Sequence, residues 1–270
     1  MADAPARFDP QRYWEERLRG EYSLAGVGYA RLGKRFNAAM YRIRGEVFDA
    51  VATRHFGPRG PARVVDIGSG TGFYVERWLA RGAAVTGIDL TEVAVGALRE
   101  RFPAARFLQA DIGAELVGDL AELTGTMAAV SAFDVLFHIV DDARYRAALV
   151  NIARLLEPGG LFLWSDNFIR QATVRVAHQA SRSLDETTEA LGGAGLTVVE
   201  RVPMFVLMNY PADTRSALAR WAWTAMVAPA MLSDLAGGLL GAMLTPLERR
   251  LVRTLRESPS TELMVCRRDG

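Results

Sequence analysis

The chain has 270 residues, 50% of them hydrophobic and 23% charged, and a formal net charge of +1. This length suits one large domain with insertions. The near-neutral charge argues against the basic surface of nucleic-acid-binding proteins, so we expect no nucleic-acid partner. A single cysteine, Cys266, leaves no internal disulfide and is typical of a reducing compartment, which predicts a cytoplasmic location.

Two segments bear on membrane targeting. The first residues, MADAPARFDPQRYWEERL, lack the apolar core of a signal peptide. Residues 220–246 are apolar, but Pro229, Asp234 and a glycine pair interrupt them. A membrane span needs about 20 uninterrupted apolar residues, so the sequence predicts no stable membrane insertion.

A helical region precedes the core. Asp9 can cap a helix whose first position is Pro10. The glycine-punctuated residues 23–34 predict a loop. Over residues 34–55, apolar positions recur at intervals of three and four, which predicts an amphipathic helix. The segment GPRGP, residues 57–61, should end it.

Short apolar runs then alternate with helical patterns. The runs begin near Ala62, Ala84, Ala105 and Met127, and a fifth begins at Leu161. Strands that alternate with helices predict right-handed βαβ units and a parallel sheet. The helix before the fifth strand should be capped by Asp141 or Asp142, and EPGG, residues 157–160, should end it.

The C-terminal half is less regular. A polar, arginine-bearing loop should lead to a short helix that starts at Ser183, and residues 195–208 predict a sixth strand. Residues 209–258 look mostly helical and unusually apolar, and residues 261–268 predict a final strand.

The glycine-rich segment VVDIGSGTG, residues 64–72, follows the first strand directly. Gly68, Gly70 and Gly72 leave the main chain bare where it must turn and let a ligand approach. A dinucleotide-binding site typically has the motif G-x-G-x-x-G, which would place its third glycine at position 73, but position 73 is Phe. A P-loop is excluded because no Lys-Ser/Thr follows the glycines. Asp66, so close to the turn, suits a cationic or amino-bearing ligand better than a pyrophosphate.

Four motifs together resemble class I S-adenosylmethionine-dependent methyltransferases of the small-molecule type. VVDIGSGTG is similar to the first motif of that family, VTGIDL (85–90) to the second and FLQADI (107–112) to the third. FDVLFHIVDD (133–142) resembles the stretch after the fourth strand, and LLEPGG the turn before the fifth. The resemblance covers residues 60–205, and the final strand is consistent with it.

The resemblance implies S-adenosyl-L-methionine as cofactor and S-adenosyl-L-homocysteine as product. Asp89 would bind the ribose hydroxyls, Asp111 the adenine amino group and Asp66 the methionine ammonium, directly or through water. Asp66 could instead orient local N–H groups, and Asp89 and Asp111 could be helix caps. Further cofactor contacts are expected from Gly68, Ser69, Gly70, Gly72, Leu90, Ile112 and Phe133.

The family also implies a fold and a division of the chain. We expect an α/β, doubly wound, seven-stranded and mostly parallel sheet with an antiparallel last strand. Residues 1–58 would form an N-terminal helical lid and residues 59–208 a Rossmann-like, cofactor-binding core. Residues 209–258 would be a helical insertion that covers the acceptor site, and residues 259–270 would supply the final strand of the core.

Side chains on the acceptor side have two interpretations each. His138 follows the fourth strand and could be a general base or structural. Asp166 ends the fifth strand and could orient a hydroxyl or cap a turn. His178 has helical spacing to Arg182 and could be a base or part of a solvated face. No ligand cluster for a metal stands out.

The lid and the insertion leave alternatives open. Tyr41 and Arg44 could contact the cofactor, with Arg44 on its carboxylate, or the tyrosine could pack as core with its hydroxyl at the edge. The insertion could roof an apolar acceptor pocket while packing on its own domain, which we rank first, or form a homodimer contact, which we rank second. It could also rest on a bilayer surface, or be only a helical pair packed against its own domain.

These features predict a methyltransferase that transfers a methyl group, most readily to oxygen, of a small apolar or sugar-like metabolite by in-line displacement. The alternatives are a C- or N-methyltransferase of a small molecule and a non-catalytic S-adenosylmethionine-binding protein. A nicotinamide oxidoreductase is disfavoured by Phe73 and by the lack of a Tyr-x-x-x-Lys pair.

Overall fold

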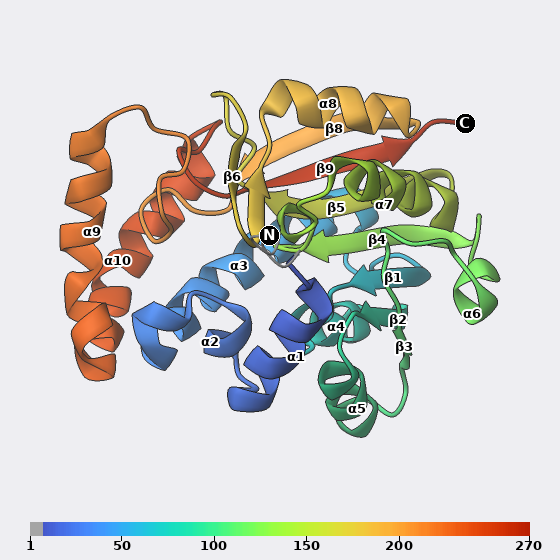
Figure 1. Ribbon diagram of the computed structural model, residues 1–270, viewed down its shortest axis with the longest axis horizontal. Coiled ribbons are helices and arrows are strands. Elements are labelled where there is room, and N and C mark those ends of the chain that lie inside the picture. The colour runs from blue at the N-terminus through green and yellow to red at the C-terminus, as the bar shows by residue number, and fades with distance from the viewer. Residues whose placement is uncertain (1–7) are drawn as a thin grey trace, which may run out of the picture.

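The computed structural model describes residues 8–270, so residues 1–7 of the predicted lid lie outside the described part. Its centre is a seven-stranded sheet in the order β3-β2-β1-β4-β5-β9-β8 (Figure 1). The strands are β1 (Arg63–Ile67), β2 (Ala84–Asp89), β3 (Arg106–Gln109), β4 (Met127–Phe133), β5 (Leu156–Asp166), β8 (Leu196–Pro203) and β9 (Glu262–Arg268). A separate hairpin joins β6 (Val174–Val176) to β7 (Gln179–Ser181).

The helices precede, separate and follow these strands. In chain order they are α1 (Pro10–Gly20), α2 (Leu24–Val27), η1 (Ala30–Leu32), α3 (Gly33–Phe56), α4 (Phe73–Ala80), α5 (Glu92–Arg101), α6 (Gly118–Ala121), η2 (Leu136–His138), α7 (Asp142–Leu155), α8 (Leu184–Gly193), α9 (Ala217–Leu232) and α10 (Asp234–Thr254).

Strand directions confirm the predicted fold class. The strands from β1 to β5 pair in parallel, and β9 runs antiparallel to both of its neighbours, β5 and β8. The order reverses between β1 and β4, which is the switch point at which doubly wound sheets bind ligands.

Each face of the sheet is covered by helices (Figure 1). On one face, Trp78 of α4 packs edge-to-face on Phe48 of α3, with ring centres 4.7 Å apart. On the other, α7 buries Ile152 in the same cluster as Trp164 of β5. Two apolar layers therefore hold the sheet rigid beneath its carboxyl edge.

Several local predictions are confirmed. The Asp9 side chain caps α1, which begins at Pro10, and the Asp141 side chain caps α7. The Ser183 side chain caps α8. In each case the side-chain oxygen accepts a hydrogen bond from the main-chain N–H three residues later.

Three local predictions are wrong. Residues 23–34 are not simply a loop, because Ser23 caps the short helix α2 and η1 follows. EPGG does not separate α7 from the next strand, because β5 already begins at Leu156, which pairs with Met127. The helical spacing from His178 to Arg182 is not realised, because residues 174–181 form the β6–β7 hairpin.

The insertion packs against the N-terminal region. Helix α10 lies along α3, where Gly241 approaches so closely that an added Cβ would stand 2.8 Å from the Cβ of Ala39. The buried Glu248 carboxylate accepts hydrogen bonds from the N–H groups of Val206 and Leu207, which follow β8. Within residues 8–270, no helix has the length and apolar character needed to cross a membrane.

Candidate functional site

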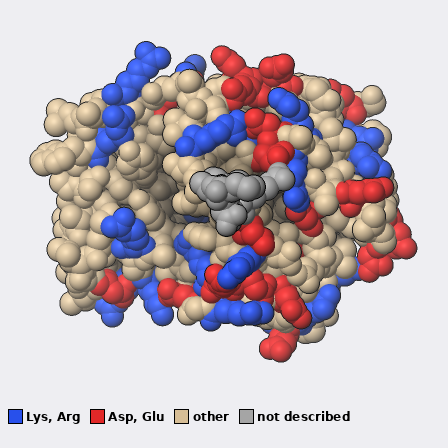
Figure 2. Space-filling view, viewed as in Figure 1, with Lys and Arg blue, Asp and Glu red and all other residues tan. Residues whose placement is uncertain are grey.

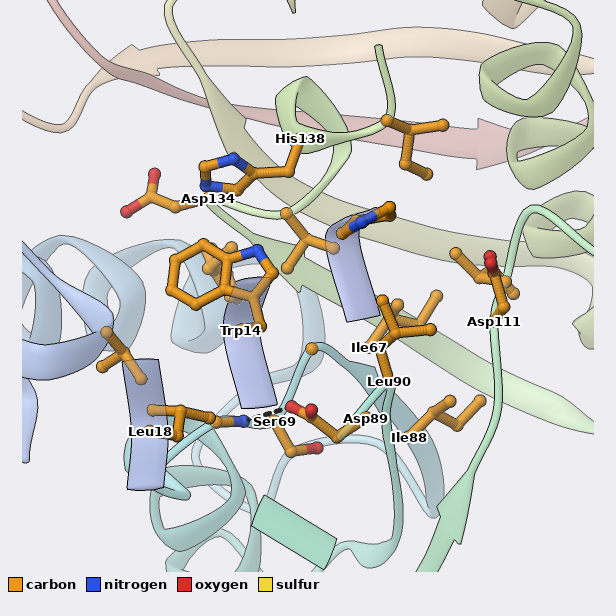
Figure 3. Close-up of a pocket in the computed structure, with 18 of the residues that line it drawn as sticks. Trp14, Leu18, Ile67, Ser69, Ile88, Asp89, Leu90, Asp111, Asp134 and His138 are labelled. Atoms are coloured by element: carbon orange, nitrogen blue, oxygen red, sulfur yellow. Dashed lines mark hydrogen bonds between the residues drawn. The ribbon is translucent and has the colours of Figure 1, made fainter. Parts of the chain in front are cut away.

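A pocket opens at the carboxyl ends of the parallel strands, and α1 lies over it (Figure 3). The turn after β1, Asp89 at the end of β2 and Asp111 after β3 all line it. Figure 3 shows Asp89 and Asp111 on one side of the pocket and Trp14, Asp134 and His138 toward the other. A crevice at this edge is where the fold is expected to hold its ligand.

The glycine turn forms the floor of the pocket. Gly68 has a φ of 65°, and a Cβ there would lie 2.4 Å from Cγ2 of Val135 in the segment after β4. Both observations require glycine, because a side chain would be strained and would clash. The main chain is thus bare where Gly68, Ser69 and Gly70 line the pocket. Gly72 does not line it and instead precedes α4.

Asp89 is held firmly at the pocket wall. One carboxylate oxygen accepts from the Gly70 N–H at 2.8 Å, and the other accepts from the N–H and hydroxyl of Thr91 at 2.9 and 2.7 Å. Burial nevertheless raises its pKa. A hydroxyl-bearing ligand that donates further hydrogen bonds would stabilise the ionised carboxylate here.

Asp111 lies across the pocket from the glycine turn. Its carboxylate accepts from the Gly113 N–H at 2.8 Å and pairs with the Arg144 guanidinium. Leu90 and Ile112 line the same part of the pocket and supply apolar surface. This end can therefore hold a flat group between apolar side chains, with a carboxylate at its edge.

Asp66 is not at the pocket surface. It lies within β1, is 2% exposed, and its carboxylate accepts from the Ser131 hydroxyl at 2.6 Å. The Trp78 indole N–H donates to the same hydroxyl oxygen at 3.0 Å. Burial raises the pKa of Asp66 to about 7. Asp66, Ser131 and Trp78 thus form a buried hydrogen-bonded network next to the glycine turn.

Asp134 and Arg44 form an ion pair at the far wall. Asp134 lines the pocket and its carboxylate pairs with the Arg44 guanidinium, which is 6% exposed and does not line it. Tyr41 and Phe133 line the pocket beside this pair. Asp134 adopts a φ of 58°, rare for a residue other than glycine. Its N–H and carboxylate both hydrogen bond to the Ser165 hydroxyl of β5, which holds that conformation.

The two predicted histidines lie close together. His138, in η2, lines the pocket, and its Nδ1 is 2.9 Å from the main-chain oxygen of His178. The two rings are stacked with centres 6.3 Å apart, but His178 does not line the pocket. Burial lowers the pKa of His138 to about 4, so its imidazole is neutral at physiological pH.

Asp166 ends β5 but does not reach the pocket. It is 5% exposed and accepts from the Asn167 N–H at 2.6 Å. Burial raises its pKa to about 7. Of the two interpretations of Asp166, capping a turn matches these contacts better than orienting the hydroxyl of an acceptor.

Trp14, Phe8 and Asp134 line the pocket although they were not among the predicted site residues. Asp134 could have been found, because it directly follows the fourth strand. Trp14 and Phe8 carry no motif, and their place depends on how α1 docks.

No residue of α9 or α10 lines this pocket in the described structure, so the insertion does not roof it. Across residues 8–270, no cluster of three or more His, Cys, Asp or Glu could hold a metal ion.

Comparisons with known proteins agree with this geometry. Residues 64–160 match the family model described as "Methyltransferase domain". A ubiquinone biosynthesis O-methyltransferase from Xanthomonas oryzae pv. oryzae is 40% identical over 104 residues, which are 38% of this chain and 42% of that protein. The chain thus spans less than half the length of that curated relative.

Two solved structures share the fold over nearly the whole chain. The Burkholderia thailandensis 1,6-didemethyltoxoflavin-N1-methyltransferase, with S-adenosylhomocysteine bound, has a TM-score of 0.56 at 22% identity, covering 100% of this chain and 94% of that one. The magnesium protoporphyrin IX methyltransferase of Synechocystis PCC 6803, with S-adenosylmethionine bound, has a TM-score of 0.57 at 14% identity, covering 98% and 100%. At these identities the likeness shows the fold alone.

We expect Gly68→Ala to destabilise the protein by about 2–4 kcal/mol, because it adds both backbone strain and overpacking against Val135. Gly118→Ala is the matched control, since Gly118 has a φ of 52° but open space around its Cβ position. Urea denaturation measures both. Equal losses of unfolding free energy in the two variants would contradict the close approach at Gly68.

Proposed function

We propose that this chain, whose residues 64–160 match a methyltransferase-domain family model, is a class I S-adenosylmethionine-dependent methyltransferase that methylates a small-molecule acceptor, preferentially on oxygen. The observation that carries the proposal is the convergence of the glycine turn, Asp89 and Asp111 on one pocket at the switch point of the sheet. The relative named as an O-methyltransferase supports oxygen. Nitrogen is the alternative, because a structural neighbour is an N-methyltransferase.

The residues present fit the cofactor. The bare turn at Gly68 lets a ligand approach the main chain. Thr71 lines the pocket, and its buried hydroxyl has no hydrogen-bond partner among the described residues. In our assignment Asp89 binds the ribose hydroxyls and Asp111 the adenine amino group. We assign Tyr41, which lines the pocket, to the methionine end; Arg44 does not line the pocket and its guanidinium already pairs with Asp134, so we assign it no cofactor contact. When bound, the cofactor supplies an electrophilic methyl group on a sulfonium.

On the acceptor side, we assign proton removal to His138. It lines the pocket, and burial keeps it unprotonated at neutral pH, as a general base must be. His178 does not reach the pocket through its side chain, so its contribution is the main-chain oxygen that holds Nδ1 of His138.

We expect Asp89→Ala to weaken binding of S-adenosylhomocysteine by about 1–3 kcal/mol, because a charged hydrogen-bond partner of the ribose is lost. Isothermal titration calorimetry measures the change. Asp185→Ala, which removes an exposed acid at the start of α8, is the control and should leave the affinity unchanged. An unchanged affinity in Asp89→Ala would refute the ribose assignment.

We expect His138→Gln to lower methyl transfer from S-adenosylmethionine to catechol, used as a simple hydroxyl probe, by about 10²-fold or more. His178→Ala is the matched control, because it keeps the main-chain oxygen that His138 contacts. Production of S-adenosylhomocysteine measures both. A similar, modest loss in both variants would remove His138 from the role of base.

The pH dependence has a defined sign. His138 acts as a base when unprotonated, so its contribution to kcat/KM is full above pH 5 and is lost as pH falls through about 4. The charged or titratable groups that act on its pKa are His178, Asp134 and Arg17. An acid limb near pH 6.5, the ordinary histidine value, would contradict this assignment.

We further propose that the exposed face of α9 and α10 is a homodimer contact. Seven large apolar side chains on it are 47–88% exposed: Leu218, Trp221, Leu232, Leu235, Leu239, Met243 and Leu247. At roughly 100–200 Å² each they expose on the order of 1,000 Å², more than the apolar patches of ordinary monomers and enough for one side of a stable dimer.

The scarcity of charged residues on this face favours a second copy of the chain over a lipid bilayer as its partner. In Figure 2 the end of the molecule that carries α9 and α10 is mostly tan. The exposed positions of α10 from Leu235 to Leu247 include no charged residue, whereas bilayer-binding helices flank their apolar face with Lys and Arg. Four of the apolar residues recur every fourth position along α10, which gives a continuous, slowly winding stripe that a two-fold axis can pair with itself.

Sedimentation equilibrium tests this contact. We expect a mass of about 59 kDa, twice the 29.5 kDa of the chain, and a monomer for Leu239→Lys with Met243→Lys. Val117→Lys, which charges an exposed apolar residue elsewhere, should stay dimeric. A monomeric native protein, or one that sediments with lipid vesicles as a monomer, would refute the dimer.

A further inference from the structure

Aromatic side chains from three separate segments meet at one part of the pocket. Trp14 of α1 packs edge-to-face on His138 of η2, with ring centres 4.8 Å apart. Tyr13 stacks on His178 at 5.7 Å, and Phe8 lies 6.4 Å from the same ring. Phe8, Trp14 and His138 line the pocket, and Figure 3 shows the Trp14 and His138 rings side by side in it.

The Trp14 ring is held in place from its own helix. The Arg17 guanidinium lies 5.0 Å from its centre, and its Nε donates to the main-chain oxygen of Gly26 at 2.6 Å. Arg17 also donates to the hydroxyl of Tyr13 at 3.0 Å. Helix α1 is thereby tied to α2, so Trp14 presents a fixed surface to the pocket.

The hydrogen bond at His138 defines which ring nitrogen carries the proton. A carbonyl oxygen only accepts, so Nδ1 of His138 must donate its hydrogen to the main-chain oxygen of His178. In the neutral ring this leaves Nε2 with its lone pair, as a proton acceptor.

The hairpin that supplies this oxygen is fastened to the segment that carries His138. Arg182 is 5% exposed, lies 3.8 Å from the ring centre of Tyr145, and donates to the main-chain oxygen of Ile139 at 2.8 Å. Arg175 donates to the main-chain oxygen of Val140 at 3.0 Å, and both arginines pair with Asp142. The position of His178, and with it the tautomer of His138, is therefore fixed by the hairpin.

This part of the pocket offers little to a charged ligand. The pocket lining includes the apolar residues Phe8, Trp14, Ile139 and Val140. Its charged side chains other than Asp89 are already engaged, because Asp134 pairs with Arg44, Arg144 pairs with Asp111, and the Asp141 carboxylate caps α7. Rigid rings favour other rings, because aromatic pairs gain energy beyond the area that they bury.

We propose that Trp14, Phe8 and His138 form an acceptor subsite for a planar aromatic molecule with an uncharged ring hydroxyl, and that Trp14 determines this preference. The proposal rests on the proposed methyltransferase function. In the transfer, the hydroxyl proton moves to Nε2 of His138 and an oxygen lone pair forms the bond to the methyl carbon. The electron pair of the broken carbon–sulfur bond stays on sulfur, which leaves a neutral thioether, and His138 then returns its proton to solvent.

Binding to the protein saturated with S-adenosylhomocysteine tests the subsite without turnover. By saturation-transfer NMR titration, we expect catechol to bind about 2- to 10-fold more tightly than cis-cyclohexane-1,2-diol, which has the same hydroxyls without the aromatic ring. Trp14→Leu should abolish the difference and Trp14→Phe should keep most of it. Trp221→Leu, in an exposed residue of α9, is the control that should leave it unchanged.

Equal binding of the two diols, no binding of catechol at ~10 mM, or an unaltered preference in Trp14→Leu would overturn the aromatic subsite. Failure of S-adenosylhomocysteine to bind in calorimetry would instead refute the proposed function, so the two failures are distinguishable.

Nitrogen-15 NMR tests the tautomer independently of activity. The chain has three histidines, so the resonances that disappear in His138→Gln are assigned to His138. We expect the neutral, Nδ1-protonated form for His138 at pH 7, and partial conversion to other forms in Arg182→Ala, which loosens the hairpin. A native His138 that is charged, or protonated on Nε2, would refute its role as acceptor of the hydroxyl proton.

Discussion

The close approach of Val135 to the main chain of Gly68 is the constraint on which the pocket depends. It joins the turn after β1 to the segment after β4, the two strands between which the order of the sheet reverses. Val135 can pack there because Gly68 has no side chain and adopts a positive φ. The segment after β4 also carries Asp134 and His138, which line the pocket. The lack of a side chain at Gly68, in the turn after β1, therefore helps to position side chains that follow β4.

Much of the fold could be predicted because its signals are local. Strand–helix alternation, the caps at Asp9, Asp141 and Ser183, and the bare turn all depend on neighbouring residues in the sequence. Strand ends at one edge also place Asp89 and Asp111 near the turn without further information. The glycine motif and two strand-end acids therefore locate, from sequence, the end of the pocket to which we assign the cofactor.

The end of the pocket to which we assign the acceptor could not be derived in the same way, because it is built from pairs of residues that lie far apart in the sequence. Arg44 meets Asp134 across 90 positions of the chain, and Trp14 meets His138 only through the docking of α1. Sequence also gives no warning that Asp166, at a strand end like Asp89, is buried away from the pocket. The apparent helical spacing from His178 to Arg182 misleads for a related reason: the arginine is placed by contacts with the loop before α7, not by a helix.

Charge separates the two ends of the pocket and gives each a different task. Asp89 and Asp111 lie on the side where the cofactor is assigned, and burial raises the pKa of Asp89, so that carboxylate gains from a ligand that donates hydrogen bonds or carries positive charge. At the acceptor end, Asp134 is neutralised by Arg44 and His138 is uncharged, so an incoming hydroxyl meets no competing ion. Methyl transfer turns a sulfonium into a neutral thioether. The ionised carboxylate of Asp89 therefore attracts the neutral product less strongly than the cationic donor, and the arrangement that favours binding of the cation also favours release after the reaction.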